Sequence, residues 1–307
     1  MAFKAGFWKP MVINKLAPAK INLTLEVLGK MKGGWHNISS IMQTIALYDT
    51  MIVQKSSRIE VITDCSQLSP WDSMTAQSSS VRMEDNLVYK AAQLLQQETG
   101  YQGGATIQLI KRIPSASGLG GGSSDGAAGL RALNELWKLG LETSKLVSIG
   151  AKLGSDVPFF IYGGTCLAEG RGEKIVPLRL SPKRWMVLLL PLLAIPEKTK
   201  TLYSYLTPEY YTLGNSTKTV RKALNNGEIV QPNCYYNVFS RIYSKLFPEF
   251  GKYFHQFEEA GARFPQVAGS GPAIYCFTRN RQEAEEVVQR LKKLGRYAYL
   301  TVTSIEN

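Results

Sequence analysis

The sequence predicts an α+β protein that is divided into two domains. Segments with strand and helix patterns follow one another without the strict strand–helix–strand alternation of a parallel sheet. The chain has 307 residues, 44% of them hydrophobic, and domains commonly hold about 150 residues. A glycine-rich stretch, residues 114–130, lies between a strand pattern and a helix pattern. We expect an extension over residues 1–10, one domain over residues 11–180 and another over residues 181–307.

The net charge of +12 permits acidic partners, namely nucleic acid, an anionic membrane or phosphorylated small molecules. The basic residues are dispersed, and the short runs 198–200 and 292–293 are typical of a solvated surface. An RNA-binding protein, the alternative from another class, requires clustered basic residues interleaved with aromatic ones, so we expect no nucleic acid. The longest apolar run, residues 185–195, is too short to span a bilayer at ~20 residues, and we expect no membrane partner.

Cysteine and histidine usage excludes several kinds of metal site. The four cysteines, at positions 65, 166, 234 and 276, are far apart, and only two histidines occur, His36 and His255. This pattern favours neither a zinc site nor a disulfide framework, and it fits a protein of the reducing cytoplasm. The sequence leaves open whether the protein is a monomer or a homodimer.

The first predicted domain mixes strands and helices. Residues 21–27 alternate as a half-buried strand, residues 38–45 fit either a helix or an irregular strand, and residues 50–54 and 59–63 are rich in β-forming residues. Residues 65–83 are polar and predict a surface loop. Asn86 is expected to cap a helix that ends at Gly100. A strand over residues 105–110, a helix over residues 144–153 and a hairpin through Gly170 and Gly172 complete this domain.

The second predicted domain opens with an apolar strand over residues 186–190. Two or three helices are expected between Lys200 and Ala260. A tight turn over residues 269–272 precedes a strand over residues 273–277, an amphipathic helix over residues 280–294 and a last strand over residues 297–305.

The glycine-rich stretch predicts a phosphate-binding loop. It holds five glycines between Gly118 and Gly126, so its backbone can approach a ligand closely. The helix that follows offers unpaired N–H groups and a positive dipole end to an anion, and its expected N-caps are Ser123, Ser124 and Asp125. A flexible linker is the alternative. A linker would not lie between a strand and a helix with apolar residues at positions 130, 133, 136 and 137.

Two familiar phosphate loops do not fit this stretch, and a third does. No lysine follows the glycines as the Walker A pattern requires, and Ser123 stands where the Rossmann fingerprint needs a glycine. The pattern Pro-x-x-x-Gly-Leu-Gly-Gly-Gly-Ser-Ser resembles the phosphate loop of the GHMP small-molecule kinases. The resemblance implies that ATP binds at Pro114, Ser115, Ala116, Ser117, Gly118, Leu119, Gly120, Gly121, Gly122, Ser123 and Ser124.

Phosphoryl transfer to an alcohol requires held phosphates, stabilised charge and a hydroxyl that is aligned and loses its proton. Residues 153–160 resemble a second motif of these kinases, in which Asp156 matches the catalytic aspartate and would accept the proton. A turn aspartate is the alternative. Residues 18–22 resemble the N-terminal motif, in which Lys20 matches the catalytic lysine, although a solvated lysine at a strand edge has the same pattern. Asn22 is expected to orient either the substrate or Lys20.

A Gly-Gly-Trp-His segment, residues 33–36, resembles the part of the family whose acceptor carries a diphosphocytidyl group. The resemblance implies that Trp35 stacks on cytosine and that His36 hydrogen-bonds to its edge. Gly33 replaces an acidic residue there, which leaves the local loop geometry open. Tyr203 is implied as a second aromatic wall. The alternative is a partly buried tryptophan beside a histidine with satisfied hydrogen bonds.

The resemblance implies a two-domain GHMP kinase fold with its active site in the interdomain cleft, and ATP and Mg²⁺ as cofactors. Gly269, Ser270 and Gly271 resemble the C-terminal glycine motif, which approaches the acceptor. Residues 237–239 resemble a further segment, but Ser240 stands where an acidic residue is usual, and we infer nothing from it. No metal ligand is assigned. A kinase resembling mevalonate or homoserine kinase is the nearest alternative, and it would not need the Trp35–His36 pair.

Overall fold

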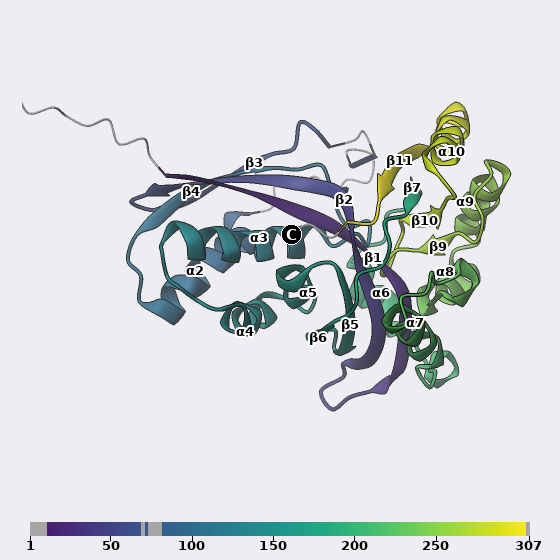
Figure 1. Cartoon of the computed structure of the whole chain (residues 1–307), viewed down its shortest axis with the longest axis horizontal. Helices are drawn as coiled ribbons and strands as arrows, with labels where there is room; N and C mark the ends of the chain where they lie inside the picture. The colour runs from purple at the N-terminus through teal and green to yellow at the C-terminus, as the bar shows by residue number, and fades with distance from the viewer. Residues whose placement is uncertain (1–10, 69–70, 73–81, 305–307) are drawn as a thin grey trace, which may run out of the picture.

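The computed structural model describes residues 11–68, 71–72 and 82–304. The extension predicted for residues 1–10 lies outside this part of the chain, as does much of the loop predicted for residues 65–83. Figure 1 shows two parts side by side, one with helices beneath a sheet of long strands and one ending in the yellow α10. Each part joins a sheet to helices, which confirms the predicted α+β class.

A seven-stranded sheet frames the first part. Strands β3, β4, β2, β1 and β8 lie in this order, while β5 pairs with β2 and β6 pairs with β5. The strands are β1 (Val12–Lys30), β2 (His36–Ser56), β3 (Ile59–Asp64), β4 (Gly104–Ile110), β5 (Thr165–Gly170), β6 (Lys174–Pro177) and β8 (Tyr236–Asn237). The ambiguous segment 38–45 is a strand within β2, and the strand predicted over residues 21–27 is the middle of the longer β1.

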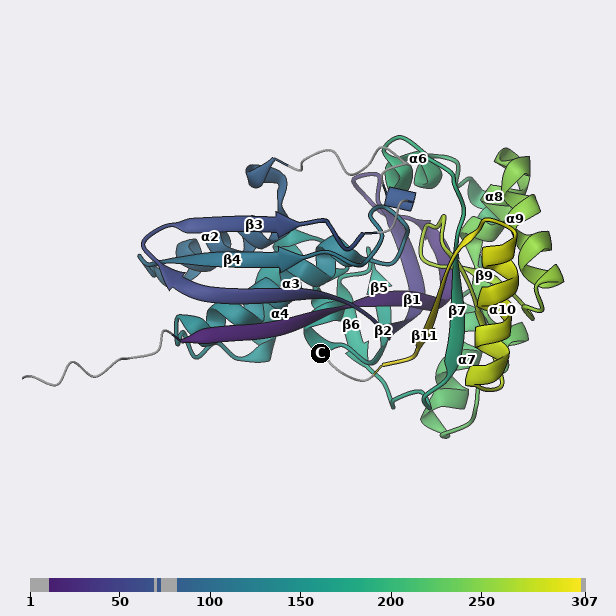
Figure 2. The ribbon, with the colours of Figure 1, turned by 90° about the horizontal axis from the view of Figure 1, so that it is seen from above.

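Strands β1 and β2 are long because they serve both parts of the molecule. Figure 2 shows them running from the first part toward the second. Accordingly, Ile13 and Ala17 of β1 belong to the core beneath the first sheet, whereas Leu25 and Val27 belong to the core of the second part. The residues between them, which include Lys20, therefore lie at the junction of the two parts.

Among the described residues, four α-helices pack in the core of the first part: α2 (Leu87–Thr99), α3 (Gly121–Leu136), α4 (Thr143–Leu153) and α5 (Val157–Tyr162). A short 3₁₀ helix, Met83–Asp85, precedes α2. The Asn86 side chain accepts a hydrogen bond from the Val88 N–H at 2.8 Å, and α2 ends at Gly100, as predicted. The predicted β5–β6 hairpin is also present.

Helix α3 follows the glycine loop directly, which excludes the linker interpretation. Its apolar residues 130, 133 and 136, and Trp137 after it, are buried as predicted. The predicted N-caps are wrong, because α3 begins at Gly121 and its N-cap is Gly120, at a left-handed φ of 78°. Ser123, Ser124 and Asp125 thus lie inside the first turns of the helix.

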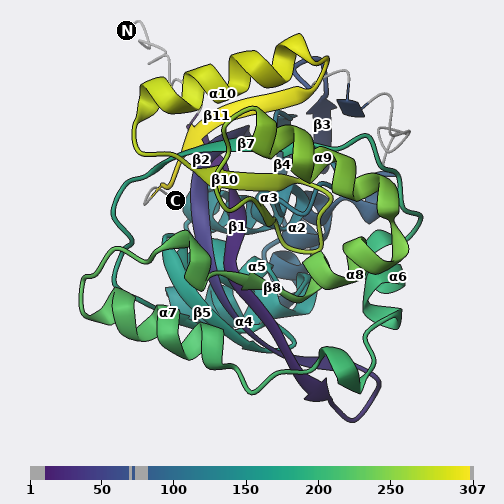
Figure 3. The ribbon, with the colours of Figure 1, turned by 90° about the vertical axis from the view of Figure 1, so that its right-hand side faces the viewer.

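The second part is built on a four-stranded antiparallel sheet with the order β11-β7-β10-β9. Its strands are β7 (Trp185–Leu190), β9 (Gln266–Val267), β10 (Ile274–Phe277) and β11 (Tyr297–Val302). Figure 3 shows α10 (Arg281–Lys293) lying alongside this sheet, with α8 (Val238–Leu246) and α9 (Pro248–Glu259) near it. Strands β7, β10 and β11 and the C-terminal helix were predicted within a few residues, whereas the short β9 was not predicted.

The prediction of two or three helices between Lys200 and Ala260 is wrong, since four α-helices cover this region: α6 (Lys198–Ser204), α7 (Asn215–Asn225), α8 and α9. Proline explains part of the difference, because Pro248 starts α9 directly after α8 ends. Two 3₁₀ helices, Pro208–Tyr210 and Pro232–Cys234, lie between these helices.

In sequence, the strands of the first sheet precede residues 178–184 and those of the second sheet follow them. The exception is β8, which comes later in the chain but joins the first sheet beside β1. The domain boundary at residue 180 remains a prediction. One residue of the predicted surface loop connects the parts: Trp71 is fully buried, and its Nε1 donates to the Pro191 carbonyl at 2.9 Å. No helix among the described residues is long and apolar enough to cross a membrane.

Candidate active site

A cleft of about 1700 Å³ opens between the two parts. Residues from both parts line it, including most of the glycine loop, the middle of β1, the start of α6 and the turn at residues 269–270. Within the described chain, its charged lining is predominantly basic: Lys20, Lys30, Lys111, Arg171, Lys198 and Lys200 against Asp85, Asp125, Asp156 and Glu197. Such a cleft favours anionic ligands.

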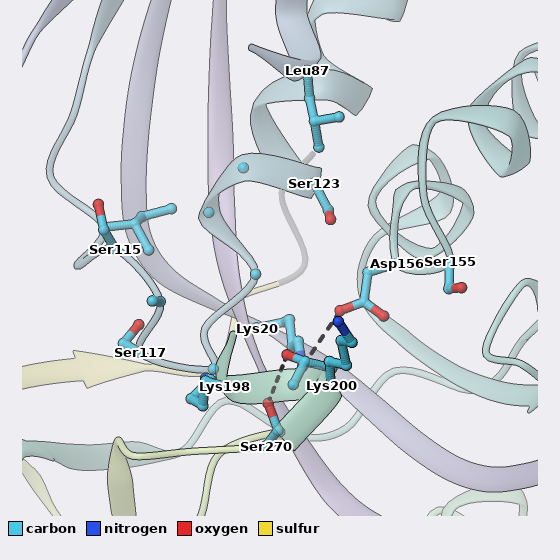
Figure 4. A pocket seen from close by; sticks show the side chains of 18 of the residues that line it. Lys20, Leu87, Ser115, Ser117, Ser123, Ser155, Asp156, Lys198, Lys200 and Ser270 are labelled. Atoms are coloured by element: carbon cyan, nitrogen blue, oxygen red, sulfur yellow. Dashed lines mark hydrogen bonds and ion pairs between the residues drawn. The ribbon is translucent and has the colours of Figure 1, made fainter. Parts of the chain in front are cut away.

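Lys20 and Asp156 face one another in this cleft (Figure 4), with 3.6 Å between Nζ and Oδ2. The Lys20 side chain is nearly buried, whereas that of Asp156 is 36% exposed. Asp156 occupies the N-cap position of α5, but its side chain makes no capping hydrogen bond. The carboxylate is therefore not used to hold the turn, which argues against the structural alternative raised from the sequence.

A chain of side-chain hydrogen bonds fixes the position of Lys20. Its Nζ donates to Asn22 Oδ1 at 2.8 Å, and Asn22 Nδ2 donates to Ser40 Oγ at 2.7 Å. Ser40 Oγ in turn donates to the Thr24 carbonyl at 2.6 Å. The β1–β2 register shifts on both sides of Lys20, and such bulges redirect side chains. Asn22 thus orients Lys20, while its contact with a substrate remains a prediction.

The glycine loop presents backbone N–H groups to the cleft. The N–H groups of Gly121, Gly122 and Ser123 begin the 16-residue α3 and have no hydrogen-bond partner in the described chain. The first N–H bonded within the helix is that of Ser124, which donates to the Gly120 carbonyl at 2.9 Å. Three free donors at the positive end of a helix dipole suit a phosphate group.

One position in this loop requires glycine. Gly118 has a left-handed φ of +92°, and a Cβ added there would lie 2.2 Å from the Ala268 carbonyl oxygen. The loop therefore contacts the 268–271 turn of the second part directly. The Ala273 N–H donates to the Ser117 carbonyl at 2.9 Å across the same contact.

Most residues predicted to bind ATP line the cleft, but two side chains do not. Leu119 is fully buried in a hydrophobic core, and Ser124 is buried behind the loop. Of the turn residues predicted to approach the acceptor, Gly269 and Ser270 line the cleft, whereas Gly271 does not. The binding role of each predicted residue remains a prediction.

The predicted base-binding residues also line the cleft. Trp35 is 55% exposed, which excludes a core tryptophan, and the Arg171 guanidinium lies 5.1 Å from the centre of its ring. His36 is buried, and its ring centre lies 5.3 Å from that of Tyr203. Burial, then the charge of Lys30, lower the pKa of His36, while a hydrogen bond to the Leu206 backbone opposes them. The other ring nitrogen, Nε2, has no partner in the described chain.

Sequence reasoning missed a buried charge cluster beneath the loop. Lys111 Nζ forms ion pairs with Asp49 and with Asp125, the latter at 2.5 Å. Asp49 also accepts from the Ile113 backbone N–H at 2.8 Å. Burial, partly offset by Lys111, raises the pKa of Asp125 to about 7. Asp49 and Lys111 are 62 residues apart, and no local pattern connects them.

The expectation of a solvated surface at residues 198–200 is wrong for Lys198. This side chain is only 9% exposed and lines the cleft, because the first turn of α6 packs against the 268–271 turn. Lys200, two residues later, is 79% exposed and pairs with Glu197 at 2.8 Å, as a surface lysine would.

This site and this fold define a class of phosphotransferase. Residues 86–164 match the family model described as GHMP kinases N terminal domain, and residues 215–296 match GHMP kinases C terminal. A solved homoserine kinase from Cytophaga hutchinsonii, with a TM-score of 0.70 and 17% identity over 100% of this chain and 98% of that one, shares the fold.

The nearer relatives carry one name. A Dehalococcoides mccartyi protein, 4-diphosphocytidyl-2-C-methyl-D-erythritol kinase, is 39% identical over 95% of this chain and 98% of its own length. A Bacillus cereus protein of the same name is 36% identical over 92% and 94%. A crystal structure of this kinase superposes with a TM-score of 0.78 and 30% identity, covering 95% of this chain and 100% of that one. The chain belongs to this family of GHMP kinases.

Proposed function

We propose that this chain transfers the γ-phosphoryl group of ATP to the 2-hydroxyl of 4-diphosphocytidyl-2-C-methyl-D-erythritol, a step of non-mevalonate isoprenoid precursor synthesis. The observation that carries the proposal is the Lys20–Asp156 pair, which shares one cleft with the three free N–H groups of the glycine loop. The likeness to mevalonate and homoserine kinases supports only the fold, since those chains are 17% identical or less. The four free cysteines support a cytoplasmic location.

Different residues of the cleft have different roles in the reaction. The N–H groups of Gly121, Gly122 and Ser123 hold phosphate oxygens of ATP. Asp156 accepts the proton of the acceptor hydroxyl as that oxygen attacks the γ-phosphorus. Lys20, held by Asn22, stabilises the negative charge that develops on the attacking and transferred oxygens.

The chemistry of two further oxygens fits a divalent cation. Ser124 Oγ and Asp125 Oδ1 are buried and have no hydrogen-bond partner in the described chain. Both are hard oxygen donors of the kind that Mg²⁺ takes together with substrate phosphates. Asp125, which lines the cleft, would hold Mg²⁺ next to the triphosphate, where the ion would neutralise phosphate charge. The Ser124 hydroxyl, which lies behind the loop, would have to turn toward the cleft to reach the same ion.

His36 supports a cytosine base in the acceptor. Because the ring bonds the Leu206 backbone carbonyl through one nitrogen and its pKa is lowered, it is neutral near pH 7 and Nε2 carries a lone pair. That lone pair can accept a hydrogen bond from the 4-amino group of cytosine. Trp35 and Tyr203 both line the cleft, and either ring can offer a flat face to the base.

An acceptor panel tests the proposal. Purified protein would be incubated with ATP, Mg²⁺ and, in separate reactions, diphosphocytidyl-methylerythritol, mevalonate, homoserine or galactose, and ADP release would be measured. We expect release with the diphosphocytidyl compound alone. Equal release with mevalonate or homoserine, or no release with the diphosphocytidyl compound, would refute the assignment.

A further inference from the structure

Lys198 is a buried lysine for which the described chain provides no counter-ion. Its Nζ donates to the Gly271 carbonyl, and no carboxylate lies within ion-pair distance among the described residues. Its main electrostatic neighbour is Lys20, a like charge. Lysine is seldom buried without a paired acid, because removing an ammonium from water is costly. The arrangement therefore requires an explanation.

Lys198 lies where the glycine loop, predicted to bind ATP, meets the 268–271 turn, predicted to approach the acceptor. The Gly271 carbonyl that it contacts would lie 2.8 Å from a Cβ at Gly118 of the glycine loop. The next residue, Thr199, bonds Ser270 through their hydroxyl groups at 3.3 Å. Figure 4 shows Lys198, Ser270, Lys20 and Asp156 gathered around the glycine loop. An anion that contacts Lys20 would therefore lie among the same side chains as Lys198.

A bound anion balances the charges here when Lys198 is protonated. In that state Lys20 and Lys198 bring two positive charges, and Asp156 brings one negative charge. Tyr243 of α8 donates to the Ser270 carbonyl at 2.9 Å, and burial raises its pKa, so it stays a neutral phenol. The remaining titratable groups on α6 are Tyr203, kept neutral by burial, and the Glu197–Lys200 pair, which neutralises itself.

We propose that Lys198 is a phosphate-binding residue, whose charged amine pairs with a phosphate oxygen of a bound substrate. The oxygen belongs either to the γ-phosphoryl group of the nucleotide or to the diphosphate of the acceptor. The inference rests on the proposed function, since both sources are substrates of that reaction.

Protonation provides a direct readout of this pairing. Burial, followed by the charge of Lys20, lowers the pKa of Lys198 to about 7 in the free protein. A phosphate oxygen beside the amine favours its charged form and raises this pKa again. Binding at pH 8 should therefore take up a proton, whereas binding at pH 6 should not, because the amine is already charged there.

The experiment measures affinity and proton uptake by calorimetry in two buffers of different ionisation enthalpy. The probes are AMP-PNP, ADP and CDP, applied to the intact protein and to Lys198→Met and Lys198→Gln. A charge-assisted hydrogen bond is worth roughly 10- to 150-fold in affinity. If the γ-phosphoryl group is the partner, the Lys198 variants should lose this affinity and the proton uptake with AMP-PNP but not with ADP. If the acceptor diphosphate is the partner, they should lose both with CDP.

Two controls keep the test specific. Lys198→Gln keeps a donor for the Gly271 carbonyl without the charge, so a purely structural role predicts that it rescues affinity. Lys252→Met removes one exposed charge on α9 that is not part of the cleft lining, and it should leave all three affinities unchanged. If all affinities and the proton uptake survive in both Lys198 variants, the inference is wrong while the proposed function stands. If neither AMP-PNP nor CDP binds the intact protein, both fail.

Discussion

Replacing Trp35 by alanine separates the base-binding role from a structural one. The side chain is 55% exposed, so its removal leaves no core cavity, and the stability lost is its contact with Arg171. Cation–π contacts at exposed sites contribute about 0.5–1 kcal/mol, whereas a buried tryptophan replaced by alanine costs about 3–5 kcal/mol. Thermal unfolding should therefore shift by only a few degrees.

The effect on the acceptor should be much larger. Stacking of a base on an aromatic side chain is worth ~1–3 kcal/mol, which corresponds to a rise in KM of roughly 5- to 150-fold at ~1.4 kcal/mol per decade. Steady-state kinetics with each substrate varied would measure it. KM for ATP should change little, and Trp35→Tyr should be mild because the ring is kept. Similar losses for both substrates, or equal damage from tyrosine and alanine, would refute the stacking argument.

Three further changes test other parts of the site. Asp156→Asn removes the proton acceptor and should lower kcat by roughly 10²–10⁴ with nucleotide binding kept, and near-normal turnover would exclude Asp156 as the base. Gly118→Ala forces a Cβ against the Ala268 carbonyl, so it should lower stability by about 1–3 kcal/mol and weaken ATP binding in calorimetry. The control Gly251→Ala, where a Cβ meets nothing within 4 Å, should do neither. Lys111→Met leaves Asp49 and Asp125 unpaired and should cost about 3–5 kcal/mol in urea unfolding. That cost should be smaller at pH 5 than at pH 8, because Asp125 no longer repels Asp49 once its carboxyl is protonated. A cost that does not change with pH would contradict this account.

Local patterns were sufficient for much of this molecule. The helix between Asn86 and Gly100 has its cap and stop residues next to it in sequence. The strand β7 is a continuous run of apolar residues, so it can be predicted directly. Lys20 and Asp156 were predicted to share one site although they are 136 positions apart, because each stands in a short recognisable segment, and the two side chains do meet in the cleft.

Contacts that depend on packing were not available from the sequence. Lys198 lies in a Lys-Thr-Lys run that has the pattern of solvated surface, and only the docking of α6 against the 268–271 turn buries it. Ser123 to Asp125 are good cap residues by type, yet the left-handed Gly120 starts the helix before them. The ion pairs of Lys111 connect the residue that follows β4 with β2 and α3, and residue type alone does not reveal such connections.

The pairing of β1 with β8 has a consequence for the order in which the site is assembled. Thr24 and Leu25 leave the ribosome more than 200 residues before their ladder partners Tyr236 and Asn237. Asn237 then holds the Val267 and Gly269 carbonyls, each at 2.8 Å. The residue that completes the first sheet thus also anchors the turn that is predicted to approach the acceptor. During synthesis, the glycine loop emerges early, but the turn that is predicted to approach the acceptor is anchored only after most of the chain has been made.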